Sequence, residues 1–357
     1  MIRTLRPFLL PIGLIVLISA VLLAMDPRAS GTRKGPPKVA LVQHASIAAL
    51  DSGVDGIVHG LAAGGFAHGT TLQLTRFNAQ GDMGTANDIA RQVTGGGFDL
   101  IVTASTLSLQ SLANANKDKR VPHVFGIVAD AAAAGVGISA TDPLDHPEWM
   151  TGYNVRVPVI KGLELAREFN PDVKKVGLVW HSSEASSLVY TRDARAAVKQ
   201  LGMELLEANA ENAGEVGLAA RSLVERGVEM FIITGDVVVL SAADSVIQEA
   251  RKARIPVVSL IPPFVRKGSL ADLGADYFAV GREVGELAAQ VLAGAAISKL
   301  PVRTLAPLTL SINLKAIEGL RPGWKVPPAV VERADLVIDS TGERRRGAAP
   351  PASAASR

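Results

Sequence analysis

The 357-residue chain contains no cysteine. Disulfide bonds, thiolate metal sites and cysteine nucleophiles are therefore excluded, as is attachment of a lipid to an N-terminal cysteine. Aromatic residues make up only 4% of the chain, which argues against the stacking surfaces that single-stranded nucleic acids need. The sequence also lacks the motifs of a phosphate-binding loop, a hydrolase nucleophile and a metalloprotease. These absences favour a function without covalent chemistry.

Positive charge is scarce in the body of the chain, although the formal net charge is +3. Residues 1–34 carry five Lys or Arg and one acidic residue, and residues 343–357 carry four Arg and one Glu. Residues 35–342 hold 28 basic and 32 acidic residues, a net charge of −4. A mildly acidic body argues against a nucleic-acid partner. The length and the 48% of apolar residues predict two domains with large cores.

One long apolar run lies near the N-terminus. Residues 7–25 (PFLLPIGLIVLISAVLLAM) are uncharged, and Arg3 and Arg6 precede them. Nineteen residues can span the hydrocarbon core, and the leading arginines would keep the N-terminus in the cytoplasm. We expect residues 1–34 to form a retained membrane anchor with a linker. A signal peptide that is cleaved near residues 29–31 is the alternative. Either way, the remainder is predicted to be periplasmic or extracytoplasmic.

Three sequence segments in the first half of the chain have similar counterparts in the second half. KVALVQHAS (38–46) returns as KVGLVWHSS (175–183), with six of nine positions identical. FDLIVTAST (98–106) corresponds to EMFIITGDV (229–237), and RVPHVFGIV (120–128) to RIPVVSLIP (254–262). Matched segments in the same order at offsets of 137, 131 and 134 residues indicate duplicated architecture.

Each repeated phrase is a continuous apolar run, which is typical of a strand buried on both faces of a parallel sheet. Helical patterns lie between these strands; residues 47–64, for example, place Leu50, Val54, Val58 and Leu61 at helical spacing. Further helices are predicted at 84–94, 107–118, 184–201, 214–226 and 241–253. Alternating strands and helices predict an α/β fold with two Rossmann-like, doubly wound lobes.

The sequence resembles a known family, the bacterial ABC-transporter substrate-binding proteins of the tryptophan/tyrosine type. The matching phrases are FNAQGD (77–82) with TANDIARQ behind it, DLIVTAST (99–106), VADAAAAGV (128–136), WHSSEASS (180–187), ITGDVVV (233–239), RKGSLADLGADYFAVGREVGELAAQVLAG (266–294) and LSINLKA (310–316). The resemblance extends from about residue 38 to about residue 318. It implies the type I periplasmic-binding fold, with two lobes joined by a hinge.

The resemblance further implies that the chain crosses between the lobes three times. Lobe 1 would comprise residues 38–157 and 279–297, and lobe 2 residues 158–278 and 300–335. The composition of residues 343–357 predicts a disordered tail.

Two departures from the family stand out. Where the family often has Asp-rich polar residues, this chain has LIPPFVRKG (260–268), so Ile261, Pro262 and Pro263 cannot supply a carboxylate. The usual aromatic amino acid is thus not assured as the ligand. The chain also lacks the lipid-bearing cysteine of many relatives.

Ligands of parallel α/β sheets bind at the carboxyl ends of the strands. An amino-acid-like ligand needs hydrogen-bond donors for its carboxylate and a carboxylate for its ammonium group. Hydroxyl groups at strand ends are candidates for the first role and aspartates for the second, and each could instead be a helix cap or turn residue. The candidate ligand-binding residues are His44, Ser46, Ser105, Thr106, Asp130, Trp180, His181, Ser182, Ser183 and Asp236.

Two of these candidates allow a different interpretation. His44 and His181 occupy equivalent places in the repeat, so a metal or acid–base pair is conceivable. The chain's six histidines show no metal-ligand spacing, which favours structural or ligand-lining roles. Trp180 would form an apolar wall of the pocket, or else belong to the core.

The predicted function is non-catalytic and requires no cofactor. We expect an extracytoplasmic solute receptor that closes its lobes over a small amino-acid-like ligand and presents it to an ABC permease. The alternative is a membrane-anchored sensor that signals to a partner protein. A two-lobed enzyme is a further alternative without a catalytic motif to support it.

Overall fold

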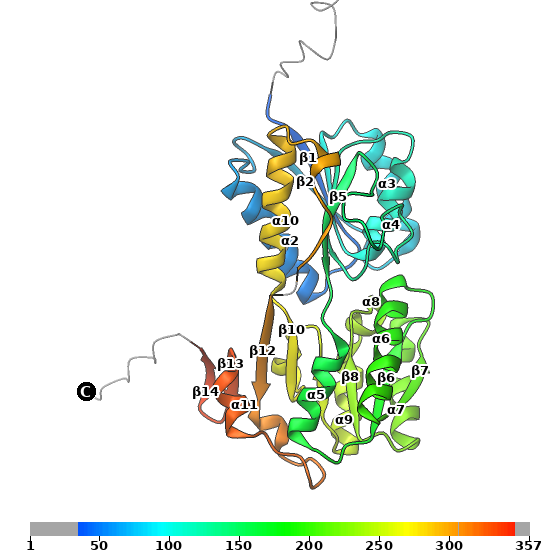
Figure 1. The fold of residues 1–357 in the computed structure, drawn as a ribbon, viewed down its shortest axis with the longest axis vertical. Coiled ribbons are helices and arrows are strands. Elements are labelled where there is room, and N and C mark those ends of the chain that lie inside the picture. Colours follow the sequence, from blue (N-terminus) through cyan, green and yellow to red (C-terminus); the bar gives the residue numbers. More distant parts are fainter. Residues whose placement is uncertain (1–34, 306, 347–357) are drawn as a thin grey trace, which may run out of the picture. The chain divides into compact units, whose positions relative to one another are not determined.

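The computed structural model describes residues 35–305 and 307–346. Two α/β lobes are present, each built on its own sheet of mainly parallel strands (Figure 1). This confirms the predicted α/β class with two sheets. The predicted membrane segment, residues 7–25, lies outside the described residues.

The first sheet has the strand order β11-β5-β4-β3-β1-β2, and every neighbouring pair is parallel. Its strands are β1 (Lys38–Gln43), β2 (Gln73–Asn78), β3 (Leu100–Ala104), β4 (His123–Val128), β5 (Met150–Val155) and β11 (Arg303–Leu305). Its helices are α2 (Ala48–Ala63), α3 (Met83–Gly95), α4 (Thr106–Asn116) and α10 (Tyr277–Leu292). Helices α2 and α10 pack together on one face of this sheet, and α3 and α4 pack together on the other (Figure 1).

The second sheet has the order β14-β13-β12-β10-β9-β8-β6-β7. Its strands are β6 (Lys175–Trp180), β7 (Glu204–Asn209), β8 (Met230–Ile233), β9 (Val257–Ser259), β10 (Ala271–Ala275), β12 (Leu308–Asn313), β13 (Leu336–Asp339) and β14 (Gly342–Arg345). Its helices are α5 (Val159–Phe169), α6 (Ala185–Leu201), α7 (Val216–Glu225), α8 (Val237–Ser241), α9 (Ala243–Ala253) and α11 (Pro328–Arg333). The strands from β7 to β10 are parallel, whereas β12 pairs antiparallel with β10 and β14 antiparallel with β13.

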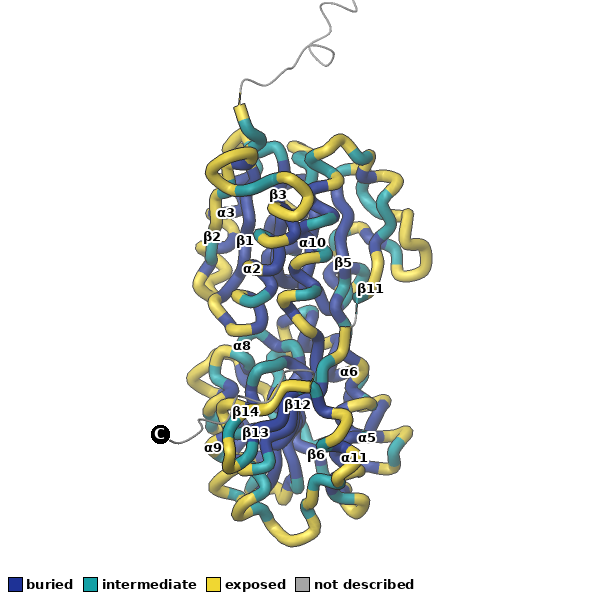
Figure 2. The backbone as a smooth tube through the Cα atoms, turned by 90° about the vertical axis from the view of Figure 1, so that its left-hand side faces the viewer, coloured by how far each residue is buried: buried dark blue, intermediate teal, exposed yellow. Residues whose placement is uncertain are grey.

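The predicted core positions are buried. Strands β3, β4 and β8 are buried along their whole length, as expected for strands with a helix layer on both faces. Figure 2 shows buried backbone in the interior of both lobes and exposed backbone mainly on their outer surfaces. In α2 the predicted apolar stripe also faces the core, since Leu50, Val54 and Leu61 are buried.

Two parts of the expected domain division are wrong. The division placed residues 300–335 in lobe 2, but β11 pairs in parallel with β5 and completes the first sheet before the chain crosses to β12. The disordered tail was expected from residue 343, but residues 342–345 form β14 on the edge of the second sheet. Charged side chains such as those of this strand suit an exposed sheet edge, and Glu343 also forms an ion pair with Arg266.

A search of residues 35–305 and 307–346 finds no helix that is both long enough and apolar enough to cross a membrane.

Glycine allows the backbones of α2 and α10 to come unusually close. A Cβ atom added to Gly60 of α2 would lie 2.1 Å from the carbonyl oxygen of Arg282. A Cβ atom added to Gly281 of α10 would lie 2.0 Å from the carbonyl oxygen of Gly53. These neighbours are backbone atoms within helices, so they cannot rotate away as side chains can. The contact fixes the position of α10, whose first residue follows a crossover from the second lobe, against α2.

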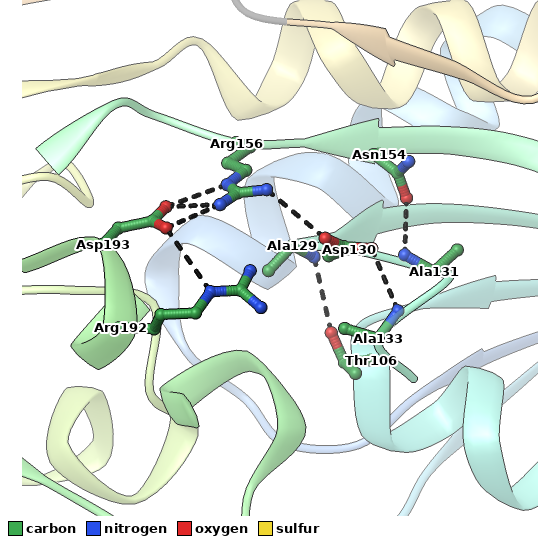
Figure 3. Close-up of polar contacts among 9 residues, drawn as sticks. All are labelled: Thr106, Ala129, Asp130, Ala131, Ala133, Asn154, Arg156, Arg192 and Asp193. Atoms are coloured by element: carbon green, nitrogen blue, oxygen red, sulfur yellow. Dashed lines mark hydrogen bonds and ion pairs between the residues drawn. The ribbon is translucent and has the colours of Figure 1, made fainter. Parts of the chain in front are cut away.

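Charged side chains connect the two lobes beside the crossover from β5 to α5. The Arg156 guanidinium donates to Asp193 of α6, with Nε 3.0 Å from Oδ2 and Nη2 2.7 Å from Oδ1. Its Nη1 lies 3.3 Å from Oδ2 of Asp130, which follows β4 in the first lobe (Figure 3). We call Asp130, Arg156 and Asp193 the Arg156 cluster. Its side chains are 22–32% exposed, so solvent screens them only in part.

The loop that carries Asp130 is itself fixed by hydrogen bonds. The Ala133 N–H donates to Asp130 Oδ1 at 3.0 Å, and the Ala131 N–H donates to Asn154 Oδ1 at 2.9 Å (Figure 3). Because both ends of the Arg156 cluster are held on ordered segments, the cluster contributes to the relative position of the lobes.

We expect Gly60→Ala to lower the free energy of unfolding by about 2 kcal/mol, because the new methyl group overlaps the backbone of α10. Gly95→Ala is the matched control: Gly95 is also helical, but a Cβ atom there meets nothing within 4 Å. That control should be neutral or stabilising by up to about 1 kcal/mol. Denaturant unfolding measures both changes. Equal stabilities for the two variants would contradict the close helix contact.

We expect Arg156→Gln to lower the free energy of unfolding by about 1–2 kcal/mol, since Asp130 and Asp193 would then lack their shared cation. The loss should shrink at high salt. Arg91→Gln is the control, because the Arg91–Asp88 pair is about 70% exposed and should contribute little. A double-mutant cycle with Asp193→Asn isolates the pair energy, and a coupling near zero would rule out the bridging role.

Candidate functional site

A pocket lies where the carboxyl ends of the strands of the two sheets meet. The space between its atoms amounts to about 490 Å³, a volume that includes open solvent at the mouth of the pocket. Its walls come from loops and helices that follow β1, β3, β4, β6, β8 and β9, together with the two crossovers at Val155 and Tyr277. The lining residues are Ile47, Ala49, Leu50, Ser105, Thr106, Ile127, Ala129, Val155, Glu184, Ser186, Tyr190, Gly235, Val237, Leu240, Ile261 and Tyr277. We call this cavity the interlobe pocket.

Most of the lining is apolar, and two tyrosines supply its aromatic surface. Tyr190 comes from α6 of the second lobe, and Tyr277 begins α10 of the first. Both are more than 90% buried. Burial raises the pKa of Tyr190 to about 12 and that of Tyr277 well above its usual value, so both hydroxyl groups are neutral at physiological pH. Tyr190 packs on Gly235, where a Cβ atom would lie 2.5 Å from the ring.

Two predicted residues, Ser105 and Thr106, line the interlobe pocket. Ser105 is the N-cap of α4, and its hydroxyl accepts from the Ser108 N–H at 3.2 Å. Its φ angle is 130°, a region that side-chain-bearing residues rarely adopt. Ile127, another lining residue, has a φ angle of 56° at an irregularity in the pairing of β4 with β5. Strained backbone at two places in one wall is typical of binding sites.

The N-terminus of α2 also reaches the pocket. Its N-cap residue is Ile47, which has no side-chain oxygen to accept from the first turn of the helix. The N–H groups of the first turn therefore have no partner from a capping side chain. Ala49 and Leu50 of this turn line the pocket. Such a helix start can bind an anion such as a carboxylate.

The pocket contains one carboxylate, that of Glu184. It is 2% exposed and directly precedes α6. The Val237 N–H donates to its Oε2 at 3.0 Å, and the Ser186 hydroxyl donates to its Oε1. Burial and the nearby Asp236 carboxylate raise the pKa of Glu184 to about 8.

The predicted residue Asp236 lies beside this pocket but not on its wall. It is completely buried as the N-cap of α8, and its Oδ1 accepts from the Val239 N–H at 2.9 Å. Its Oδ2 accepts from the His181 N–H at 2.6 Å. Both oxygens thus have backbone partners, and a role in ligand binding stays a prediction.

The other predicted residues of the second lobe point elsewhere. The Trp180 ring lies under Arg195, whose guanidinium carbon is 5.5 Å from the ring centroid. The His181 ring has its Nε2 3.5 Å from Glu211, and the Ser182 hydroxyl donates to Glu211 at 3.3 Å. Ser183 is exposed. Trp180 is the last residue of β6 and the other three follow it; none of the four lines the interlobe pocket.

The remaining candidates belong to the first lobe. His44 is buried, and burial lowers its pKa, so the neutral ring is favoured. Ser46 is exposed and accepts from the Asn78 side chain at 2.9 Å. Asp130 belongs to the Arg156 cluster. His44 and His181 are not part of a metal-binding group: the described residues contain no cluster of three or more His, Asp or Glu side chains that could hold an ion.

Two of the sixteen lining residues were predicted from the sequence, and Glu184, Tyr190 and Tyr277 are among the fourteen that were not. Glu184 lies inside WHSSEASS and Tyr277 inside LGADYFAVGR, two of the phrases that carry the family resemblance, so this signal was available. Tyr190 sits mid-helix, where the sequence offers no indication that it faces a pocket.

The chain is similar to known proteins in sequence and in fold. The family described as ABC transporter substrate binding protein matches residues 38–338. A tyrosine-binding protein of Clostridioides difficile is 30% identical over 280 residues, which are 78% of this chain and 79% of that protein.

Two solved structures extend the comparison. An ABC domain in complex with L-Trp from Streptococcus pneumonia is 25% identical, with a TM-score of 0.79 over 85% of this chain and 100% of that one. The ligand-free, open structure of a substrate binding protein from Clostridium difficile is 30% identical, with a TM-score of 0.63 over 84% of this chain and 98% of that one. The chain therefore belongs to the ABC transporter substrate-binding protein family, whose members are non-catalytic solute-binding components that work outside the cytoplasm.

Proposed function

We propose that this chain captures an aromatic amino acid in the interlobe pocket and delivers it to an ABC permease. The observation that carries the proposal is a pocket lined by both lobes, with two buried tyrosines, one from each lobe, and polar groups in its lining. An aromatic side chain would pack against Tyr190, Tyr277 and the aliphatic lining residues. Two relatives support this ligand class, because one is named for binding tyrosine and another was solved with L-Trp.

The polar groups suit the two charges of an amino acid. On the first lobe, the uncapped start of α2 and the hydroxyl groups of Ser105 and Thr106 would receive the ligand carboxylate. On the second lobe, Glu184 is the carboxylate within the pocket. The expected departure at residues 260–268 does not exclude this ligand. Ile261 contributes apolar surface there, and the negative charge comes from a different loop.

Ligand release and capture require the lobes to move apart and close. A ligand that contacts both lobes favours the closed arrangement by its difference in affinity for the two states. The structure is more similar to the L-Trp complex than to the open, ligand-free relative, although its sequence is closer to the latter. This supports a hinge at the crossovers, with the Arg156 cluster stabilising the closed arrangement. We also propose that residues 7–25 hold the protein at the membrane.

The test is a thermal-shift measurement on the full chain with L-tryptophan, L-tyrosine, other amino acids and sugars. A ligand present at about one hundred times its dissociation constant adds about 2.7 kcal/mol of stability, so the melting temperature should rise by a few degrees with an aromatic amino acid.

Val237→Trp should abolish this rise, because the larger side chain fills the pocket that Val237 lines. Val238→Trp is the matched control, since Val238 is the next residue of α8, is half-buried as well, and does not line the pocket. A rise produced only by a sugar, or one that survives in Val237→Trp, would contradict the proposal.

A further inference from the structure

Glu184 has no cationic partner. In the described part of the chain its carboxylate accepts from the Val237 and Val238 N–H groups and from the Ser186 hydroxyl, and no Lys, Arg or His side chain forms an ion pair with it. By contrast, Asp130 and Asp193 near the lobe boundary share Arg156. Ionising a carboxyl group that is buried in mostly apolar surroundings without a counter-charge is unfavourable, so an acid at this position requires an explanation.

The surroundings of Glu184 increase its affinity for positive charge. Asp236 adds a second buried carboxylate beside it, and this neighbour together with burial raises the pKa of Glu184 to about 8. The other titratable groups that line the pocket are Tyr190 and Tyr277, whose raised pKa values keep them neutral. Glu184 is therefore the lining group that changes charge near neutral pH.

A purely structural role does not account for the acid at this position. The first turn of α8 already has a carboxylate cap in Asp236. Glu184 accepts from two further N–H groups of that turn, those of Val237 and Val238, and the side-chain oxygen of a neutral glutamine can also accept from backbone N–H groups. The negative charge itself has no partner among the described residues, whereas an ammonium group in the pocket would provide one.

We propose that Glu184 is the residue that recognises the ammonium group of the ligand, and that it selects free amino acids over analogues that lack this group. The inference rests on the proposed function. The ligand would lie with its ammonium group toward the second lobe and its carboxylate toward the start of α2 in the first, so that its two charges bridge the lobes. In this proposal Glu184, and not Asp236, is the carboxylate that binds the ammonium group.

The experiment compares wild type and Glu184→Gln by titration calorimetry with L-tryptophan and with its des-amino analogue, in which hydrogen replaces the ammonium group. Glutamine keeps one acceptor oxygen for the Val237 N–H and replaces the carboxylate by a neutral amide of the same shape. We expect the variant to bind L-tryptophan about 10- to 100-fold more weakly, the size of a lost charge-assisted hydrogen bond. Binding of the analogue should be unchanged or tighter.

The control is Glu211→Gln, which removes a carboxylate that follows β7 in the second lobe and does not line the pocket. It should bind both ligands as wild type does. Equal loss of both ligands in Glu184→Gln, or no loss of either, would overturn the ammonium-binding role. If wild type binds neither L-tryptophan nor any other aromatic amino acid, the proposed function fails instead. A melting temperature for each variant shows whether it is folded.

Proton release provides a second readout that a structural role would not produce. Below its pKa of about 8, free Glu184 carries a proton, and a bound ammonium group favours the carboxylate. Binding at pH 7 should therefore release a fraction of a proton, measured as a dependence of the binding enthalpy on the ionisation enthalpy of the buffer. Affinity should rise between about pH 6 and about pH 7.5. Glu184→Gln should lose both effects, and their survival in this variant would overturn the inference.

Discussion

Parallel strand pairing is the constraint on which the site depends. In a parallel sheet all carboxyl ends lie along one edge, so the loops that follow β1, β3 and β4 meet, as do those that follow β6, β8 and β9. The strands are mainly apolar, and the polar residues that line the pocket follow their carboxyl ends. The interlobe pocket exists because two such edges face one another, and its residues come from distant parts of the sequence.

Close packing makes those edges rigid enough to form a defined pocket. The glycines of α2 and α10 bring two backbones together, and each helix contributes its first turn to the pocket wall. On the second lobe, α6 carries Tyr190 into the pocket and Asp193 toward Arg156. A movement of α6 would therefore change the pocket and the Arg156 cluster together. This coupling links ligand contact to the relative position of the lobes.

Charge is distributed unevenly across the pocket. The first lobe presents the start of α2 and hydroxyl groups, whereas the second presents Glu184 with Asp236 behind it. A zwitterion bound between the two tyrosines would match this asymmetry. Its carboxylate would exchange water for the start of α2 and the hydroxyl groups, and its ammonium group would exchange water for Glu184. Reversible binding of this kind uses non-covalent contacts alone.

The sequence by itself determined the duplicated strands and helices, the two sheets and the family, because hydrophobic periodicity and repeated phrases are local properties. It also indicated Ser105 and Thr106, which follow a buried strand and do line the pocket. It could not choose between Asp236 and Glu184, since both precede helices in the same lobe. Only the tertiary structure decided that Asp236 accepts from the His181 and Val239 N–H groups behind the pocket, while Glu184 lies on the pocket wall. It likewise placed β11 in the first sheet, because strand partners are set by packing between distant segments.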